Sequence, residues 1–164
     1  MPHTSESRII AAAAADVWAA ITDLEAAVRW NRNWQRVEYV GERRQGVDTS
    51  FRAHTDDGLA HDFRISEWAH EELVTFVPVR PEEEGPYLIT LVAQTFRLRP
   101  ADEQATDVIL SAEAAGHGLR GWFAARFVWP SYQRQGLRSA LDSLQAMFEA
   151  LEYEDEGTAS RGEE

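Results

Sequence analysis

Cysteine is absent from the 164-residue sequence, which excludes disulfide bonds, a thiolate nucleophile and cysteine-ligated metal sites. Long hydrophobic runs are absent too, and none approaches the roughly 20 apolar residues that a transmembrane helix needs. The chain does not begin with a basic segment followed by an apolar core, so no signal peptide is expected. Together these absences favour a cytoplasmic protein without membrane insertion.

Positive charge is scarce. Sixteen lysine and arginine residues stand against 28 aspartate and glutamate residues, which gives a net charge of −12. Such a chain repels nucleic-acid phosphates and anionic lipid headgroups, so neither is an expected partner. The simpler interpretation of the acidic residues is that they keep the protein soluble. The oligomeric state is left open.

The length and composition fit one globular domain. Apolar residues make up 44% and charged residues 27% of the chain, which is ordinary for a folded protein. The sequence contains no internal repeat and no linker-like segment. We expect a single domain over residues 1–152 and an acidic, disordered tail over residues 153–164.

Apolar residues at helical spacing mark both ends of this domain. After a short predicted strand at residues 8–11, a helix is expected from Ala14, and a second short helical stretch covers residues 24–30. The last helix is predicted over residues 137–151, and Pro130 is expected to kink it or to start it. Its amphipathic stripe consists of Leu137, Leu141, Leu144, Phe148 and Leu151.

Between these helices the pattern is that of strands joined by turns. Asp57-Gly58 is typical of a tight hairpin turn. Connections this short join antiparallel strands, because parallel strands need a crossover of about a dozen residues or more. The six predicted strands cover residues 37–39, 49–55, 59–68, 73–79, 87–99 and 106–115.

The apolar face of one sheet needs a cover, and the long last helix is the element available. The sequence therefore predicts an α+β, helix-grip fold. A seven-stranded, curved antiparallel sheet would surround the C-terminal helix, with two short helices after the first strand. An apolar cavity is expected between the sheet and that helix.

Four short segments occur in an order that is typical of a known family: Ala14–Asp23, Trp30-Asn31, Val37-Glu38 and Gly46–Phe51. With the long final helix, they resemble the START-related helix-grip superfamily (SRPBCC) of polyketide cyclases and dehydratases, lipid-transfer domains and the birch pollen allergen. The resemblance covers residues 8–152. It implies a hydrophobic or amphipathic small molecule bound between sheet and helix, in a family of enzymes, carriers and regulators.

The sequence departs from the family pattern at two positions. Asp48 stands where the family often has the second glycine of a Gly-X-Gly-Thr motif. Glu67, or a residue next to it, stands where the aromatase/cyclase branch has an arginine thought to act on the polyketide. The second departure argues against cyclase chemistry and leaves the binding cavity in place.

Side chains alternate between the two faces of a strand, and this alternation predicts the lining of the cavity. Ala112 and Ala114 on the inner face would leave room that a tight core would not. Thr90 and Val92 are expected on the same inner face as Gln94. The ligand-binding candidates on the strands are Phe51, His61, Phe63, Ile65, Glu67, Gln94, Phe96, Leu110 and Ala112.

The polar members of this set are His61, Glu67 and Gln94. A few polar groups in an apolar wall are typical of a ligand pocket. His61 and Glu67 are also the catalytic candidates, as an acid–base pair, because a histidine titrates near neutral pH. In the alternative interpretation, His61 and Glu67 lie at strand ends in water and Gln94 bonds to a neighbour; a β-bulge would also change which face they share.

Aromatic residues near loops and at the start of a helix are candidates for the mouth of the cavity. The alternative is that they build the core, which is the more frequent role of tryptophans in a small domain. Trp129 and Tyr132 carry the same two interpretations. The candidates taken as ligand-binding are Trp30, Trp34, Tyr87, Trp122, Phe123 and Phe127.

Two further patterns are not interpreted as sites. Residues Gly116–Gly121 spell G-x-G-x-x-G, but no second βαβ strand follows, so a dinucleotide cofactor is not expected. The five histidines show no His-x-x-x-His spacing, and no metal is expected.

Three functions remain open. The first is a binding or carrier domain for a small hydrophobic or aromatic molecule, without cofactor. The second is a cofactor-independent polyketide cyclase or dehydratase that uses the same cavity. The third is a regulatory module that binds another protein, which a filled core and an exposed apolar patch would favour.

Overall fold

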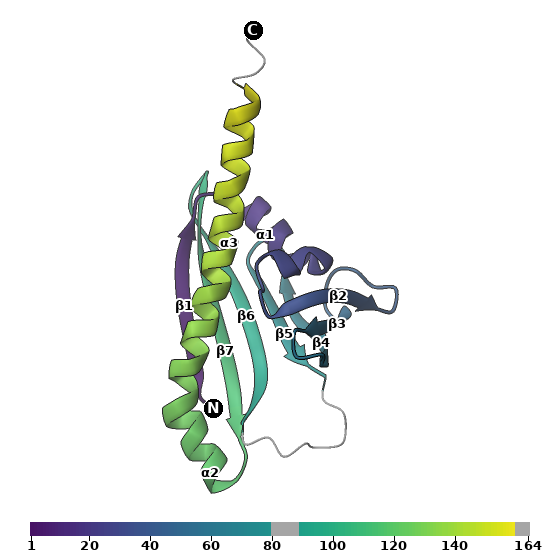
Figure 1. Cartoon of the computed structure of the whole chain (residues 1–164), viewed down its shortest axis with the longest axis vertical. Coiled ribbons are helices and arrows are strands. Elements are labelled where there is room, and N and C mark those ends of the chain that lie inside the picture. Colours follow the sequence, from purple (N-terminus) through teal and green to yellow (C-terminus); the bar gives the residue numbers. More distant parts are fainter. Residues whose placement is uncertain (80–88, 160–164) are drawn as a thin grey trace.

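The structure is a computed structural model and describes residues 1–79 and 89–159 (Figure 1). Seven antiparallel strands form one sheet in the order β1-β7-β6-β5-β4-β3-β2. The strands are β1 (His3–Ile10), β2 (Trp34–Val40), β3 (Ser50–Thr55), β4 (Ala60–Ala69), β5 (Leu73–Pro78), β6 (Ile89–Asp102) and β7 (Ala105–Gly116). The helical segments are α1 (Ala14–Thr22), η1 (Leu24–Arg29), α2 (Gly118–Phe123), η2 (Ala124–Val128) and α3 (Trp129–Ala159).

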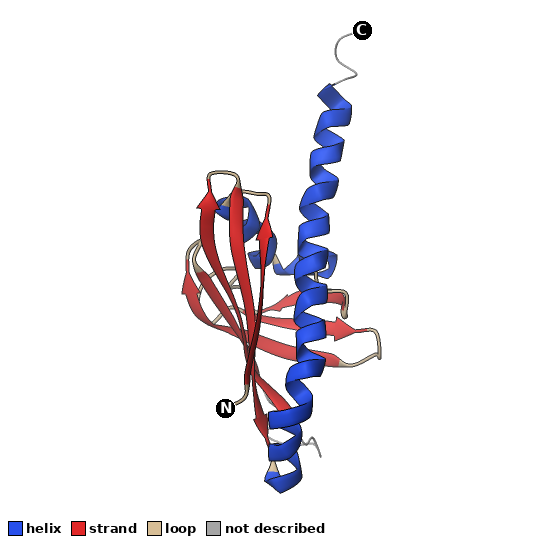
Figure 2. Ribbon diagram, turned by 90° about the vertical axis from the view of Figure 1, so that its left-hand side faces the viewer, coloured by secondary structure: helices blue, strands red, loops and turns tan. Residues whose placement is uncertain are grey.

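The sheet is curved, and the long helix runs along one of its faces (Figure 2). α3 packs mainly against β1 and β7, while α1 contacts β6 and β7 and η1 contacts β2. The predicted α+β helix-grip fold is therefore confirmed. No helix in the described ranges is long and apolar enough to cross a membrane.

The core lies between this inner face of the sheet and the helices. The predicted stripe of α3 supplies Leu137, Leu141 and Leu144, each at most 1% exposed. Burial of one such side chain stabilises the fold by about 1.5–3 kcal/mol. The sheet and Trp30, which follows η1, add six aromatic residues whose rings contact one another: Trp30, Trp34, Phe51, Phe63, Phe76 and Phe96.

The long helix extends beyond its predicted bounds at both ends. At its C-terminal end α3 continues to Ala159, so the expectation of a disordered tail from residue 153 is wrong for residues 153–159. Residues 153–159 contain two glutamates and one alanine, which favour helices, and one glycine, which does not. At the other end Pro130 is the second residue of α3 and lacks the N–H that would bond the carbonyl of Arg126. The preceding turn, η2, is a π-helix, and the chain stays helical past the proline.

Candidate functional site

The register of the strands decides which predicted site residues share the inner face. Phe63 lies opposite Phe51 and Pro78, and Gln94 lies opposite Phe76 and Ala112. The neighbours of Gln94 on both sides belong to the buried core, so its side chain is on the inner face. The inward orientation expected for Phe51, Phe63, Ile65, Gln94, Phe96, Leu110 and Ala112 agrees with this register.

A β-bulge in β4 overturns the expected orientation of Glu67. The register shifts between Ile65 and Glu67, so that Ile65 lies opposite buried Phe76 while Glu67 lies opposite Thr75. Because neighbouring residues of β5 point to opposite faces, Glu67 is on the outer face. There its Oε2 accepts a hydrogen bond of 2.7 Å from the Thr75 hydroxyl.

The hypothesis that His61 and Glu67 form an acid–base pair is therefore wrong. His61 lies opposite buried Ala53, on the inner-face side, but at the beginning of β4 where its side chain is exposed. The two side chains project from opposite faces of the same strand, so they cannot meet at one reacting atom. The alternative interpretation, with His61 at a strand end in water, describes its position.

A second bulge, in β6, changes which of the residues that precede Gln94 lie on the inner face. The register shifts between Leu91 and Ala93, and Leu91 lies opposite buried Ala114. Thr90 lies opposite Ala115 and is therefore on the outer face, contrary to expectation, while Val92 is the inserted residue and has no partner in β7. Leu91, missed in the sequence, packs against the edge of the core together with Ile89. The alternation of apolar residues in the sequence of β6 did not show the position of the bulge.

Most of the buried candidates are core residues. Trp30, Trp34, Phe51 and Phe96 are between 0 and 8% exposed. Trp30 contacts Trp34 and Phe96 with ring centroids 6.0 and 5.2 Å apart. These contacts fill the interior beside η1, which confirms the core interpretation of the two tryptophans. Ile65, Leu110 and Ala112 are likewise at most 1% exposed.

The helices cover the inner face of the sheet less completely at the N-terminal halves of β4 and β6. Phe63, Ile89, Leu91 and Gln94 point to the same face as the core and yet are only half-buried. The cause is the position of α3, which packs mainly on β1 and β7 and covers this part of the sheet incompletely. We call these four residues the inner-face rim. They are apolar apart from the Gln94 amide.

The aromatic residues at the start of the long helix have a different environment. Trp122, Phe123 and Phe127 are 54%, 53% and 65% exposed. Their rings contact one another, with centroids 5.1 Å apart for Trp122–Phe123 and 5.8 Å apart for Phe123–Phe127. Beside them is an open hollow of about 510 Å³ lined by Leu119, Arg120, Phe123, Ala124, Phe127 and Val128. Helical spacing of 119, 123 and 127 in the sequence could have indicated this face.

A second open hollow, of about 550 Å³, lies where α3 passes η1. Neither hollow is enclosed between the sheet and the helix, and neither includes a strand residue. Trp129, at 9% exposure, belongs to the core, whereas Tyr132 is 77% exposed. Tyr87 lies outside the described residues. The hollow between α3 and η1 is lined by Arg29, Arg32, Ser143, Ala146, Met147, Ala150, Leu151 and Glu154.

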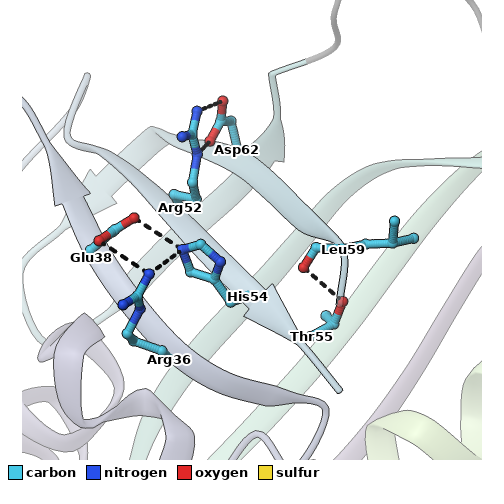
Figure 3. A network of polar contacts seen from close by, with 7 residues as sticks. All are labelled: Arg36, Glu38, Arg52, His54, Thr55, Leu59 and Asp62. Atoms are coloured by element: carbon cyan, nitrogen blue, oxygen red, sulfur yellow. Dashed lines mark hydrogen bonds and ion pairs between the residues drawn. The ribbon is translucent and has the colours of Figure 1, made fainter. Parts of the chain in front are cut away.

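The main polar network is on the outer face of β2, β3 and β4 (Figure 3). His54 Nε2 lies 3.0 Å from Glu38 Oε1 and 3.1 Å from Arg36, and Arg52 donates two hydrogen bonds to Asp62. The hydrogen bond from His54 lowers the pKa of Glu38, and that from Arg52 lowers the pKa of Asp62. Because this network faces away from the core, it supports the sheet and is not part of the inner-face rim.

The glycine-rich segment is a packing feature. A Cβ added to Gly116 would collide with the backbone of Gly121, so the end of β7 and the first turn of α2 are in direct contact. Gly118, the first residue of α2, has a φ of +67°, which suits glycine where the chain turns from β7 into the helix. No cluster of metal-binding side chains occurs among the residues that the structure describes.

Comparisons with known proteins agree with this architecture. A family model described as polyketide cyclase / dehydrase and lipid transport matches residues 1–149. No curated protein matches the sequence.

Three solved structures illustrate the likeness in fold. XoxI from Bacillus cereus has a TM-score of 0.71 and 17% identity, over 93% of this chain and 99% of that one. A START superfamily protein from Mycobacterium smegmatis has a TM-score of 0.70 and 14% identity, over 91% and 98%. The ZhuI aromatase/cyclase from Streptomyces sp. R1128 has a TM-score of 0.68 and 17% identity, over 90% and 93%. Identities this low establish the fold alone.

Proposed function

Because the chain belongs to the polyketide cyclase / dehydrase and lipid transport family, we propose that it binds a small hydrophobic or aromatic molecule. The molecule lies against the inner-face rim, beside the first turns of the long helix. The observation that carries the proposal is the incomplete burial of Phe63, Ile89, Leu91 and Gln94 on the face that elsewhere forms the core.

The chemistry of the rim suits such a molecule. Phe63 contacts buried Phe51 and Trp34, with ring centroids 5.3 and 5.7 Å apart, so its half-buried ring is held as a rigid aromatic wall. Leu91 adds aliphatic surface, and burial of apolar surface is worth about 25 cal/mol per Å². The Gln94 amide supplies one donor and one acceptor group to orient a polar atom of the ligand. An apolar wall with few polar groups is typical of sites for small molecules.

An enzymatic function has less support. A cyclase or dehydratase needs acid and base groups that converge on the reacting carbon atoms. Glu67 projects from the outer face and His61 lies exposed at the strand end, so neither converges with Gln94. A binding or carrier function requires no such convergence.

Native mass spectrometry of freshly purified protein tests the proposal without assuming a ligand. The expected result is a bound species of defined mass in the apolar range. Titration with the fluorescent probe anilinonaphthalene sulfonate provides a second readout. Absence of both a bound mass and probe binding would refute the proposed function.

A pair of variants in β6 locates the site. Gln94→Trp fills the rim and is expected to weaken probe binding about tenfold or more, equivalent to about 1.4 kcal/mol. The matched control is Arg97→Trp, because Arg97 is exposed on the outer face of the same strand. Equal affinities of the two variants would contradict a site at the rim.

A further inference from the structure

The helical segment formed by α2, η2 and the first turn of α3 presents an exposed apolar surface. Six large apolar residues between positions 119 and 132 are more than half exposed. The rest of the helix is different, because Leu137, Leu141 and Leu144 face the core. We call this surface the helix-start face. It consists of Leu119 (75% exposed), Trp122 (54%), Phe123 (53%), Phe127 (65%), Val128 (66%) and Tyr132 (77%).

The same segment has a charge opposite to that of the whole protein. Residues 114–141 contain four arginines and no aspartate or glutamate, although the chain has a net charge of −12. Arg134 and Arg138 lie 3.8 and 3.2 Å from Glu6 of β1. Arg120 and Arg126 are exposed and form no ion pair within the described part of the chain. Two unpaired guanidinium groups therefore flank the helix-start face.

The position of this surface keeps it away from the acidic end of the helix. α2 lies at one end of the molecule, and α3 ends at the other (Figure 1). At about 1.5 Å per residue, Glu152 is about 40 Å from Arg126 along the helix axis. The Debye length at physiological ionic strength is about 8 Å. The acidic C-terminal turns therefore do not cancel the positive field at the helix start.

We propose that the helix-start face docks the protein onto a membrane surface that contains anionic lipids. Aromatic side chains favour the boundary between acyl chains and headgroups, and arginines beside them meet lipid phosphates. An amphipathic helix of this composition lies in the plane of the interface and does not span the bilayer. The net charge of −12 does not describe this surface, because it sums the charges at two distant ends of the molecule.

Other occupants fit the surface less well. A nucleic acid offers phosphates but no apolar layer to cover six large side chains. A second copy of the chain, related by a twofold axis, would place the same two arginines against their own counterparts. A bilayer offers both an apolar layer and a negative boundary, which matches the pairing of side chains on this face.

Vesicle flotation of the full chain tests the proposal. The protein is expected to float with vesicles of equal parts phosphatidylcholine and phosphatidylglycerol, and much less with phosphatidylcholine alone. High salt should weaken the binding. Trp122 is the only exposed tryptophan of the six, so a blue shift of fluorescence on adding anionic vesicles reports its burial.

Three variants identify the surface. Arg120→Gln with Arg126→Gln should weaken partitioning about 30-fold, from the loss of two charges near the membrane. Arg120→Lys with Arg126→Lys should retain it. Trp122→Ala with Phe127→Ala should also lose it, whereas Tyr153→Ala, which removes a 78% exposed aromatic residue at the far end of the helix, should not.

The proposal is overturned if the wild-type chain does not float with anionic vesicles, or if the helix-start variants float as well as the wild type. If the wild type does not bind vesicles but self-associates in light scattering, and the variants lose this self-association, the surface instead binds a second copy of the chain. Ligand binding is measured in solution with Gln94→Trp, so each of the two proposals can fail without the other.

Discussion

Two glycine-to-alanine substitutions near the long helix should change stability in opposite directions. In Gly116→Ala the new Cβ meets the carbonyl group of Gly121 and the amide nitrogen of Trp122, which are backbone atoms. They cannot move aside as a flexible side chain would, so either β7 or α2 must shift. Overpacking of this kind destabilises a protein by about 1–3 kcal/mol.

Gly136→Ala, inside α3, is the matched control. Nothing lies within 4 Å of a Cβ built on Gly136, and its φ is not positive. Alanine is favoured over glycine inside a helix by about 0.8–1 kcal/mol. The two substitutions therefore add the same methyl group but should differ by about 2–4 kcal/mol in the free energy of unfolding.

Chemical denaturation by urea, followed by far-ultraviolet circular dichroism, measures the difference. The midpoint should fall for Gly116→Ala and rise for Gly136→Ala, with unchanged slopes. In a thermal melt, each kcal/mol corresponds to about 2–4 °C for a chain of this size. If Gly116→Ala is as stable as the wild type, the close contact between the end of β7 and α2 does not exist.

Three further outcomes follow from the same structure. Asp62 has its pKa lowered by Arg52, so the pair stabilises the fold above the ordinary carboxyl pKa of about 3.9 and the gain is lost as the pH falls through the lowered value. Both side chains are at least 40% exposed, so Asp62→Asn should lose no more than about 1 kcal/mol at pH 7, seen as a smaller difference between melts at pH 7 and pH 3. Glu67→Gln should leave probe binding unchanged because Glu67 is on the outer face, and a loss of affinity comparable to that of Gln94→Trp would contradict this placement. Phe96→Ala should reduce the free energy of unfolding by about 3–5 kcal/mol, measured by urea denaturation, and a loss under about 1 kcal/mol would mean that the aromatic interior is not tightly packed.

The strand order and the long helix could be predicted because their patterns are periodic. Leu137, Leu141 and Leu144 recur at helical spacing, and all three are buried residues of α3. In β7 the alternation from Val108 to Ala114 holds without a break, so each residue faces as expected. Such regular spacing records which side of an element meets the core.

The faces of Glu67 and Leu91 could not be predicted, because each lies next to a bulge that adds one residue to its strand. A bulge depends on how two strands pair, and the local sequence of one strand does not mark it. Whether Trp122 is buried or exposed could not be predicted either, for a related reason. Helical spacing shows that it shares a surface with neighbouring aromatic residues, but not whether another element covers that surface.

Methyl NMR during titration with anilinonaphthalene sulfonate tests most directly whether a small apolar molecule occupies the inner-face rim. The methyl signals of Leu91 and Ile89 should shift in proportion to occupancy. Ile9, which is 61% exposed on the outer side of β1, provides the reference that should not move. Shifts confined to Ile9 or to the helix start, with Leu91 and Ile89 unchanged at saturation, would contradict the proposed site.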